Sequence, residues 1–285
     1  MTIKTIGVVG AGAMGGGIAQ VAAMAGYNVI LRDIDMKFVD NAIARMEKFM
    51  ARSIEKGKMT EEAAKETITR ITKTTTLEDM ASADFIIEAV LEKIELKKEV
   101  FQTLHKVCGP DTIFATNTSS MSVTEIAAAS GRPEKVCGMH FFNPAQLMKL
   151  VEVIHAIQSS DETIAATIEL ARSFGKTTVE VKKDSPGFIV NRLTFPYMVE
   201  AARILEEGVA SVEDIDTAIK LGLNYPMGPF ESFDMGGIDL ATAIMEYFAK
   251  EFNNSNYAPP QILKQRLRAG LIGRKTGEGF YKYKK

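Results

Sequence analysis

The glycine-rich segment near the N-terminus constrains the fold more than any other feature of the sequence. Gly10, Gly12 and Gly15 form the pattern G-x-G-x-x-G directly after the apolar run Thr5–Val9, at the start of a run of small apolar residues suited to a buried helix. A strand, a glycine loop, a helix and a second strand make a βαβ unit with parallel strands. The chain is therefore expected to contain an α/β dinucleotide-binding domain.

Each residue of this loop has a physical task in such a domain. Gly10 permits a tight turn, Gly12 lets a pyrophosphate approach the backbone, and Gly15 lets the helix pack closely against the strand. Ala13 and Met14 open the helix, whose first N–H groups and partial positive charge favour phosphate. Glycine loops are common, so it is the position between a strand and a helix that makes the pattern typical of a dinucleotide site.

Asp33 favours NAD as the dinucleotide. It lies 23 residues after Gly10, at the end of the next apolar run. Its carboxylate can accept hydrogen bonds from the adenosine ribose hydroxyls and would repel a 2′-phosphate. Arg32 beside it could accommodate that phosphate, so NADP remains a minority alternative. A second alternative is a purely structural turn, with Asp33 as a surface carboxylate.

The pattern beyond the loop predicts two domains. Apolar runs at 85–87, 113–115, 136–139, 150–154 and 178–181, with helical stretches between the first three, indicate an open, mostly parallel α/β sheet of the doubly wound Rossmann type. Strand patterning stops at Asp184-Ser185-Pro186-Gly187, where Pro and Gly favour a boundary. We therefore predict an NAD-binding Rossmann domain at 1–184, with a helical insertion at about 36–73, and an all-helical substrate and dimerisation domain at 185–285.

Charge and composition limit the kind of partner. The net charge is −2, so no global field attracts nucleic acid or an anionic membrane, and any anion site must be local. Apolar stretches are broken well before the length of a bilayer-spanning helix, and the N-terminus carries no secretory signal, so a cytoplasmic protein is expected. Cys108 and Cys137 are too few for a disulfide framework and are predicted to be buried thiols. The pattern calls for no metal.

His140 is the best candidate for an acid–base residue among three histidines. It begins the segment His140-Phe141-Phe142-Asn143-Pro144 directly after an apolar strand, where open α/β sheets place their ligand crevice. A neutral imidazole there can take a hydroxyl proton as hydride leaves the substrate. Considered alone, however, a histidine at a strand end is more often structural.

Glu152 favours the functional interpretation of His140. It interrupts the apolar run 150–154, and a carboxylate on a buried face needs a partner. If the two strands lie side by side, Glu152 can accept a hydrogen bond from one ring nitrogen of His140 and increase the basicity of the other. The alternative is a solvent-facing glutamate in an alternating strand.

Five motifs together resemble those of the 3-hydroxyacyl-CoA dehydrogenase family. The resemblance covers essentially the whole chain and keeps the order of the motifs, and the bacterial 3-hydroxybutyryl-CoA dehydrogenases are nearest in size. The motifs are Gly10-Ala11-Gly12-Ala13-Met14-Gly15, Asn117-Thr118-Ser119-Ser120, His140-Phe141-Phe142-Asn143-Pro144, Asp184-Ser185-Pro186-Gly187-Phe188-Ile189-Val190-Asn191-Arg192 and Lys275-Thr276-Gly277-Glu278-Gly279-Phe280-Tyr281.

The resemblance implies an NAD-linked oxidoreductase that interconverts a short-chain (3S)-3-hydroxyacyl-CoA and its 3-ketoacyl-CoA. The pair expected here is 3-hydroxybutyryl-CoA and acetoacetyl-CoA, in fatty-acid or butanoate (butyrate) metabolism. The resemblance also suggests a homodimer formed through the C-terminal domain, which has more Met, Leu, Ile and Phe than its own core needs.

The resemblance further implies roles for individual residues. His140 and Glu152 would be the general acid–base pair, Ser119 would bond the C3 oxygen of the substrate, and Asn191 would polarise a carbonyl oxygen. From the residues alone, Ser119 could instead cap a helix, and Asn191 could be a first-turn helix residue. By motif position the further cofactor contacts are Glu92, Lys97, Asn117, Asn143 and Lys275.

A basic stripe in the helical insertion offers a site for coenzyme A. From the residues alone an ordinary solvated face is favoured, because Glu47 and Glu55 lie among the cations. The resemblance reverses this preference and implies that Arg52 and Lys56 contribute to substrate binding. The spacing of the stripe places four residues on one helix face: Arg45, Lys48, Arg52 and Lys56.

Two other functions remain open at this point. One is a related two-domain dehydrogenase that acts on a hydroxy acid without coenzyme A and needs no basic helix. The other is an NAD-binding protein with a structural or sensing role, which would have no need to keep a set of acid–base and oxygen-binding residues together.

Overall fold

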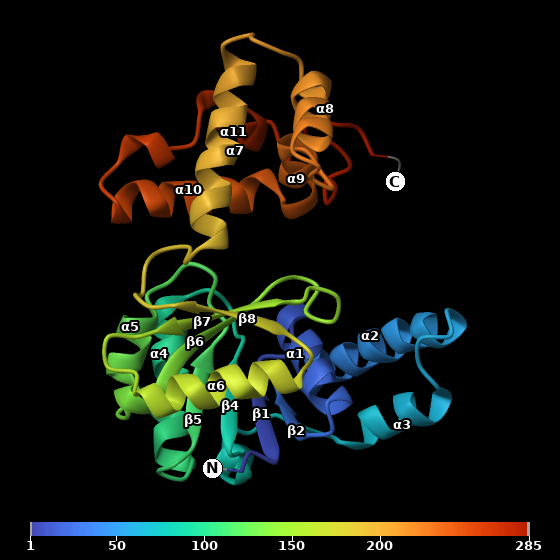
Figure 1. Cartoon of the computed structure of the whole chain (residues 1–285), viewed down its shortest axis with the longest axis vertical. Helices are drawn as coiled ribbons and strands as arrows, with labels where there is room; N and C mark the ends of the chain where they lie inside the picture. The colour runs from blue at the N-terminus through green and yellow to red at the C-terminus, as the bar shows by residue number, and fades with distance from the viewer. Residues whose placement is uncertain (1, 284–285) are drawn as a thin grey trace. The chain divides into compact units, whose positions relative to one another are not determined.

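The chain forms two compact units in a computed structural model that describes residues 2–283. The division falls between Phe188 and Ile189. The part before it is called the N-terminal unit and the part after it the C-terminal unit. On the single colour scale of Figure 1, the N-terminal unit runs from blue to yellow and the C-terminal unit from yellow to red.

An eight-stranded sheet forms the centre of the N-terminal unit. The strand order is β3-β2-β1-β4-β5-β6-β7-β8, and all neighbours are parallel except β6 and β7, which are antiparallel. The chain builds the sheet outward from β1 to β3 and then returns to the other side of β1, which is the arrangement that creates a ligand crevice at the end of β1. The strands are β1 (Thr5–Val9), β2 (Asn28–Arg32), β3 (Ile71–Thr74), β4 (Phe85–Glu88), β5 (Ile113–Thr116), β6 (Val136–Phe141), β7 (Leu150–His155) and β8 (Thr177–Val181).

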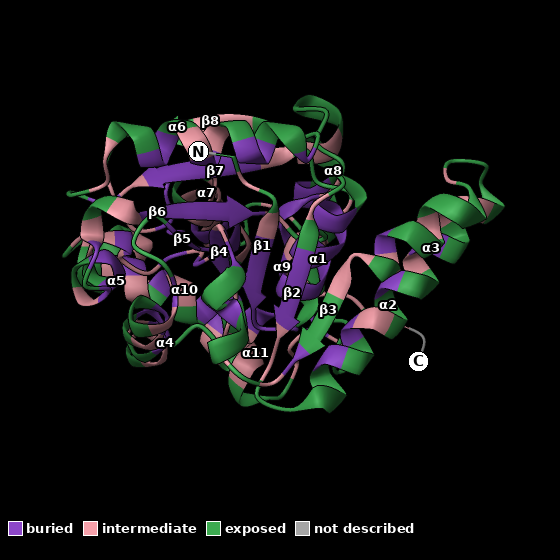
Figure 2. Ribbon diagram, turned by 90° about the horizontal axis from the view of Figure 1, so that it is seen from below, coloured by how far each residue is buried: buried purple, intermediate pink, exposed green. Residues whose placement is uncertain are grey.

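Helices cover both faces of this sheet, because alternate side chains of each buried strand point to opposite faces. On one face, α1 (Ala13–Met24), α2 (Met36–Glu55) and α6 (Asp161–Ser173) pack with strand residues such as Ile6 and Val8. On the other, α4 (Ile94–Val107), α5 (Val123–Ala129) and the 3-10 helix η1 (Glu78–Ser82) pack with residues such as Ile86. The remaining elements are α3 (Glu61–Thr69), beside α2, and the 3-10 helix η2 (Pro133–Lys135). Figure 2 shows the central strands buried between the helices.

The helical insertion is shorter than predicted. The expected helix start at Thr60 is confirmed, since its hydroxyl oxygen accepts a hydrogen bond from Ala63 N at 3.2 Å. The helix ends at Thr69, however, and Ile71–Thr74 forms the edge strand β3, so the prediction of helix through residue 73 is wrong. Thr72 and Lys73 are exposed on this edge strand, which is why its composition resembles that of a polar helix end (Figure 2).

The C-terminal unit is a helical bundle. Its core contains Phe230, Phe233 and Met245. The last motif of the chain is not helical; it is held by Asp234, whose carboxylate accepts hydrogen bonds from Phe280 N and Tyr281 N, each at 2.8 Å. The helices are α7 (Val190–Glu206), α8 (Val212–Gly222), α9 (Pro229–Gly236), α10 (Ile238–Glu251) and α11 (Gln261–Arg268), with the 3-10 helix η3 (Ser255–Tyr257). The predicted fold class, a Rossmann-type sheet with a helical C-terminal part, is confirmed.

Two smaller predictions concern thiols and membranes. Cys108 and Cys137 are free and buried, as expected. Burial raises the pKa of the Cys108 thiol to about 11 and that of Cys137 to about 12. Over residues 2–283, every helix is too short or too polar to cross a lipid bilayer.

Candidate active site

The glycine loop has the geometry that a dinucleotide requires. Gly10 has φ = 107°, and a Cβ there would collide with the carbonyl of Ala89. A Cβ at Gly15 would collide with the carbonyl of Gly10. Gly12, by contrast, has no atom within 4 Å of the position that a Cβ would take. Two glycines are thus demanded by the fold, and the third leaves the backbone at the start of α1 open to a phosphate.

Asp33 ties the end of β2 to this loop. Its Oδ2 accepts a hydrogen bond from Ala11 N at 2.7 Å, and its Oδ1 accepts one from Ile34 N at 2.7 Å. A carboxylate oxygen has a second lone pair, so both oxygens can still accept bonds from ribose hydroxyls. Arg32 donates through Nε to the carbonyl of Thr75 at 3.1 Å. This bond ties the guanidinium of Arg32 to the residue that follows the edge strand β3.

Arg45 reaches the glycine loop from α2. Its Nη2 donates to the carbonyl of Ala11 at 2.8 Å and to that of Gly12 at 3.3 Å. The peptide groups of the loop are therefore held on one side by Asp33 and on the other by Arg45. This contact differs from the predicted role of Arg45 in a stripe for coenzyme A, because helix spacing alone does not reveal which neighbour a long side chain reaches.

His140 and Glu152 form a buried pair at the centre of the site. They are directly opposite each other in the antiparallel ladder of β6 and β7, so their side chains lie on the same face of the sheet. His140 Nδ1 is 2.7 Å from Glu152 Oε2, and the two residues are 5% and 0% exposed. The predicted hydrogen bond is present, and the solvent-facing alternative for Glu152 is wrong.

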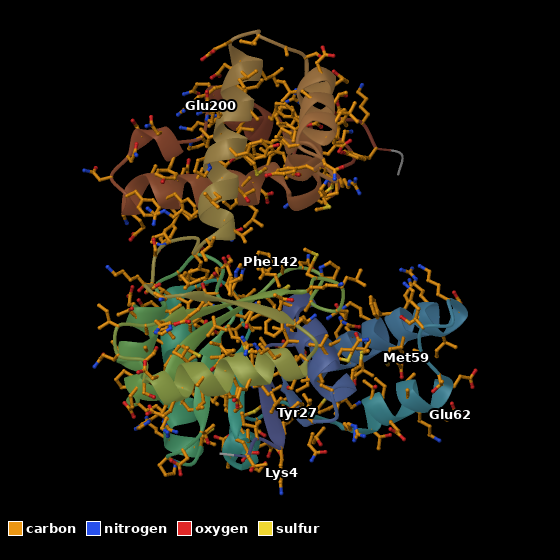
Figure 3. All side chains as sticks on the ribbon, viewed as in Figure 1. Lys4, Tyr27, Met59, Glu62, Phe142 and Glu200 are labelled. Carbon is orange, nitrogen blue, oxygen red and sulfur yellow. The ribbon has the colours of Figure 1, made fainter. Side chains whose placement is uncertain are left out.

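Aromatic rings surround the imidazole. The centroids of Phe142 and Phe188 lie 4.6 and 5.5 Å from that of His140. Phe142 follows β6 at the carboxyl edge of the parallel strands, and Figure 3 shows it at the opposite edge of the N-terminal unit from Lys4 and Tyr27, which precede β1 and β2. The apolar rings limit access of water to the side chain that would exchange a proton.

The segment 117–120 follows β5. In the strand order of the sheet it lies between the glycine loop after β1 and His140 on β6. Asn117 accepts a hydrogen bond from Phe141 N through Oδ1 at 2.8 Å, which binds this segment to the end of β6. Ser119 N donates to Glu92 Oε1 at 2.9 Å, which binds it to the end of β4. Predicted residues from three separate motifs, together with Glu92, therefore converge at the carboxyl ends of β1, β4, β5 and β6, which is the ligand-binding edge of such a sheet.

Lys97 has its charged group inside the protein. It is 1% exposed, and its Nζ lies 2.8 Å from Glu88 Oε1 and 3.1 Å from Glu92 Oε2. Burial would lower the pKa of Lys97, but the charges of Glu88 and Glu92 outweigh it and raise the pKa above its ordinary value. The ammonium stays charged and bonds to Glu88 and Glu92, and the cofactor contact implied by its motif position stays a prediction.

The loop that carries Asn143 is fixed by a residue that the sequence did not single out. Asn143 is exposed between β6 and β7. Lys176, 8% exposed, donates through Nζ to the carbonyls of Ala145 and Met148 at 2.5 and 2.9 Å. Burial lowers the pKa of Lys176. No sequence signal distinguishes it from other lysines, because its partners are backbone carbonyls.

Two predicted site residues belong to the C-terminal unit. Asn191 lies in the first turn of α7. Lys275 Nζ donates to Asp239 Oδ2 at 2.7 Å, and the charge of Lys275 helps hold the pKa of Asp239 below its ordinary value against the opposing effect of burial.

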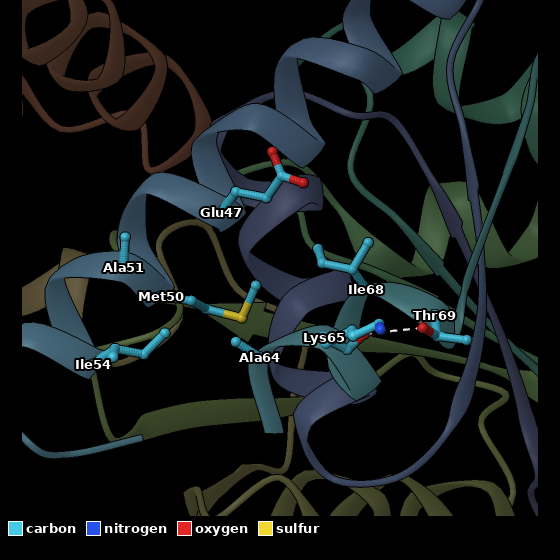
Figure 4. A pocket seen from close by; sticks show the side chains of 8 residues that line it. All are labelled: Glu47, Met50, Ala51, Ile54, Ala64, Lys65, Ile68 and Thr69. Carbon is cyan, nitrogen blue, oxygen red and sulfur yellow. Dashed lines mark hydrogen bonds between the residues drawn. The ribbon is translucent and has the colours of Figure 1, made fainter. Parts of the chain in front are cut away.

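The basic stripe and the pocket of the helical insertion lie on different sides of α2. The pocket is formed where α2 faces α3, and Figure 4 shows the side chains around it. Arg52 and Lys56 do not line it and are exposed. The lining residues are Glu47, Met50, Ala51, Ile54, Ala64, Lys65, Ile68 and Thr69. Because these positions fall about half a turn from the stripe, a phosphate bound to the stripe would not occupy the pocket.

The Rossmann-type sheet, its open glycine loop and the buried histidine at its carboxyl edge define a dinucleotide-dependent oxidoreductase. Comparison with known families then gives the particular class. Residues 5–185 match the NAD-binding domain of 3-hydroxyacyl-CoA dehydrogenase, and residues 187–283 match the C-terminal domain of the same enzymes. The chain belongs to the 3-hydroxyacyl-CoA dehydrogenase family and is an NAD-dependent member of it.

Individual relatives agree over the full length. A probable 3-hydroxybutyryl-CoA dehydrogenase of Bacillus subtilis is 47% identical over 99% of this chain and 98% of its own. A 3-hydroxybutyryl-CoA dehydrogenase of Clostridioides difficile is 44% identical over 98% and 99%. The crystal structure of (S)-3-hydroxybutyryl-CoA dehydrogenase from Ralstonia eutropha matches with a TM-score of 0.97 and 42% identity over 100% of both chains. The resemblance seen in the motifs is confirmed, and the family match favours it over the two other functions considered from the sequence.

Proposed function

We propose that this enzyme interconverts 3-hydroxybutyryl-CoA and acetoacetyl-CoA, with His140 and Glu152 as its general acid–base pair. The 2.7 Å hydrogen bond between two almost fully buried side chains carries the proposal. The names of the full-length bacterial relatives support the short acyl chain.

The chemistry of His140 depends on which ring nitrogen bears hydrogen. A carboxylate only accepts hydrogen bonds, so Nδ1 facing Glu152 carries the hydrogen and Nε2 of the neutral ring has the lone pair. In the direction of oxidation, Nε2 removes the proton of the C3 hydroxyl as hydride leaves C3. Glu152 then stabilises the imidazolium. In the direction of reduction, the imidazolium returns the proton to the C3 oxygen.

Two further residues, one from each unit, have proposed roles toward the substrate. Ser119 would hold the C3 oxygen, and Asn191 would polarise a carbonyl oxygen of the thioester. Both roles rest on the family motifs. Arg52 and Lys56, which are exposed on the side of α2 away from the pocket, are the proposed cations for the phosphates of coenzyme A.

The residues of the N-terminal unit fit NAD. Gly12 and the start of α1 would receive the pyrophosphate, and Asp33 would receive the ribose hydroxyls. Glu92, Asn117, Asn143 and Lys275 remain proposed contacts by motif position. When bound, the nicotinamide accepts the hydride in oxidation and donates it in reduction.

The domain roles and the assembly are also part of this proposal. Residues 1–184 would bind the cofactor, and 185–285 would bind substrate and form a homodimer. Exposed apolar residues in the C-terminal unit, including Leu193, Leu221 and Leu223, support a protein contact there. A cytoplasmic location stays a prediction.

The proposal is tested by following NADH oxidation with acetoacetyl-CoA, longer 3-ketoacyl-CoA thioesters and free acetoacetate. We expect the largest kcat/KM with acetoacetyl-CoA and no appreciable turnover of the free acid. A clear preference for a longer thioester would contradict the proposed chain length. The His140→Gln variant serves as the control for the acid–base role, and gel filtration with light scattering tests the dimer.

A further inference from the structure

A buried carboxylate that no motif identifies lies directly behind the proposed active site. Glu88 is the last residue of β4 and is 0% exposed. Its Oε1 accepts hydrogen bonds from Val90 N at 2.7 Å and from Lys97 Nζ at 2.8 Å. Its Oε2 accepts one from Thr116 Oγ1 at 2.7 Å. Burying a charge is costly unless the charge is paired and hydrogen-bonded. These three bonds meet that condition, and they also fix the position of the Glu88 carboxylate.

Lys97 passes this constraint on to Glu92. Its ammonium bridges Glu88 Oε1 and Glu92 Oε2, at 2.8 and 3.1 Å. Partial burial would raise the pKa of Glu92. The charge of Lys97 and the hydrogen bonds from Thr118 and Ser119 outweigh it and hold that pKa below its ordinary value. Glu92 is therefore kept ionised and able to accept hydrogen bonds.

Glu92 in turn holds the segment that contains the proposed catalytic serine. Its Oε1 accepts from Ser119 N at 2.9 Å and from Ser119 Oγ at 3.4 Å, and it is also hydrogen-bonded to the hydroxyl of Thr118. Thr118 is fully buried. One carboxylate thus faces Lys97 with one oxygen and the serine segment with the other.

We propose that Glu88 is a positioning residue for Ser119 and acts through Lys97 and Glu92. The inference deepens the proposed function, since it rests on the role of Ser119 at the C3 oxygen of the substrate. A carboxylate suits this role better than an apolar side chain, because it can accept from one N–H and two O–H donors of the serine segment at once. The strand end, the helix α4 and the serine segment are thereby joined at one point.

The test replaces the ion pair without leaving a lone buried charge. Removing one partner of a buried pair is strongly destabilising, whereas replacing both with apolar residues is often tolerated, so the double variant Glu88→Leu/Lys97→Met is the informative one. We expect kcat with acetoacetyl-CoA to fall by about 10- to 100-fold, as for loss of an aligned hydrogen-bonding group. The kcat is measured at saturating NADH, because Glu92 is itself a proposed cofactor contact and its displacement should also weaken NADH binding.

The pH dependence separates positioning from a general loss of stability. In Glu88→Leu/Lys97→Met, Glu92 loses the neighbouring cation, so the pKa of Glu92 should rise and the serine segment should lose its acceptor as the pH falls. The acid side of the pH–rate profile should therefore begin at a higher pH than in the unmodified enzyme. Glu88→Gln, which keeps Lys97, should leave the acid side unmoved and recover most of the activity.

Thr112→Val provides a matched control at the other end of the same strands. Thr112 is 4% exposed, immediately precedes β5, and donates to the carbonyl of Ala83 at 3.1 Å. The change should lower the melting temperature without changing kcat or the pH profile. If Thr112→Val at matched loss of stability lowers kcat as much as the double variant does, the positioning role is overturned.

A cycle with Ser119→Ala distinguishes failure of the inference from failure of the proposed function. If Glu88 acts through Ser119, replacing the pair in a Ser119→Ala background should cost little further activity. If the double variant lowers kcat by the same factor in the Ser119→Ala background as in the unmodified enzyme, the inference is overturned and the role of Ser119 stands. Undiminished kcat in Ser119→Ala alone would instead overturn the proposed role of Ser119 and the inference with it.

Discussion

His140 and Glu152 oppose each other as a registered cross-strand pair, with Nδ1 2.7 Å from Oε2. His140→Gln should lower kcat by about 10²- to 10⁴-fold, the usual range for a general acid–base residue. Glu152→Gln should also lower kcat, because the imidazolium loses its charge partner. The double variant should be little worse than His140→Gln alone, since residues that act as a unit are not additive.

The measurement is steady-state kcat for each variant beside NADH affinity by fluorescence titration. NADH affinity should be nearly unchanged in all three. Near-normal kcat in His140→Gln would contradict the acid–base assignment. If the losses of kcat in the two single variants multiply in the double variant, His140 and Glu152 do not act as a pair.

Asp33 should make the enzyme prefer NADH to NADPH. Its carboxylate lies against the glycine loop through Ala11 N, where a 2′-phosphate would meet a like charge, and Arg32 is engaged with Thr75. We expect kcat/KM for NADH to exceed that for NADPH by at least about tenfold, or roughly 1.4 kcal/mol in the transition state. Asp33→Asn should reduce this ratio. Equal use of both cofactors by the unmodified enzyme would show that Asp33 does not set the preference.

Arg45 should support cofactor binding rather than the binding of coenzyme A. Arg45→Met removes its bonds to the carbonyls of Ala11 and Gly12. We expect NADH to bind about three- to tenfold more weakly, the effect of one hydrogen bond, because the bond to Gly12 is long and adds little. Lys48→Met removes the same charge from the same helix and is the control. Similar losses in both variants would indicate a general electrostatic effect instead of a contact with the loop.

Arg52 and Lys65 offer a direct comparison of the two sides of α2. Arg52→Ala should raise KM for acetoacetyl-CoA several-fold, more strongly at low salt, while KM for NADH stays constant. Lys65→Ala, at the pocket between α2 and α3, should leave both constants unchanged. The reverse result would move the proposed coenzyme A site from the basic stripe to the pocket.

The sequence was most informative where local pattern and chemistry coincide. The glycine loop and Asp33 are placed by strand and helix periodicity, and Glu152 stands out as a carboxylate in an apolar strand. The same reasoning applied to Glu88, which ends an equally apolar strand, would have identified the other buried carboxylate of the sheet. It was missed because its cation, Lys97, appears in the sequence as one of several lysines on an amphipathic helix.

Other features could not be predicted from local pattern. The strand character of Ile71–Thr74 comes from pairing with β2 at an exposed edge, so its side chains carry no apolar alternation. The contact of Arg45 with the glycine loop depends on how α2 packs on α1, and helix periodicity gives the face of a side chain but not its partner. The role of Lys176 depends on the path of a loop backbone.

The antiparallel pairing of β6 with β7 has a consequence for how such an enzyme can diversify. The ladder, and not the connecting segment 142–149, keeps the histidine and the glutamate opposed, and a shift by one residue would turn the glutamate to the other face. The part of that segment beyond Asn143 can therefore vary in composition while the ladder holds the proton-transfer geometry constant. Changes of selectivity and the chemistry of proton transfer can therefore be located in different parts of one hairpin.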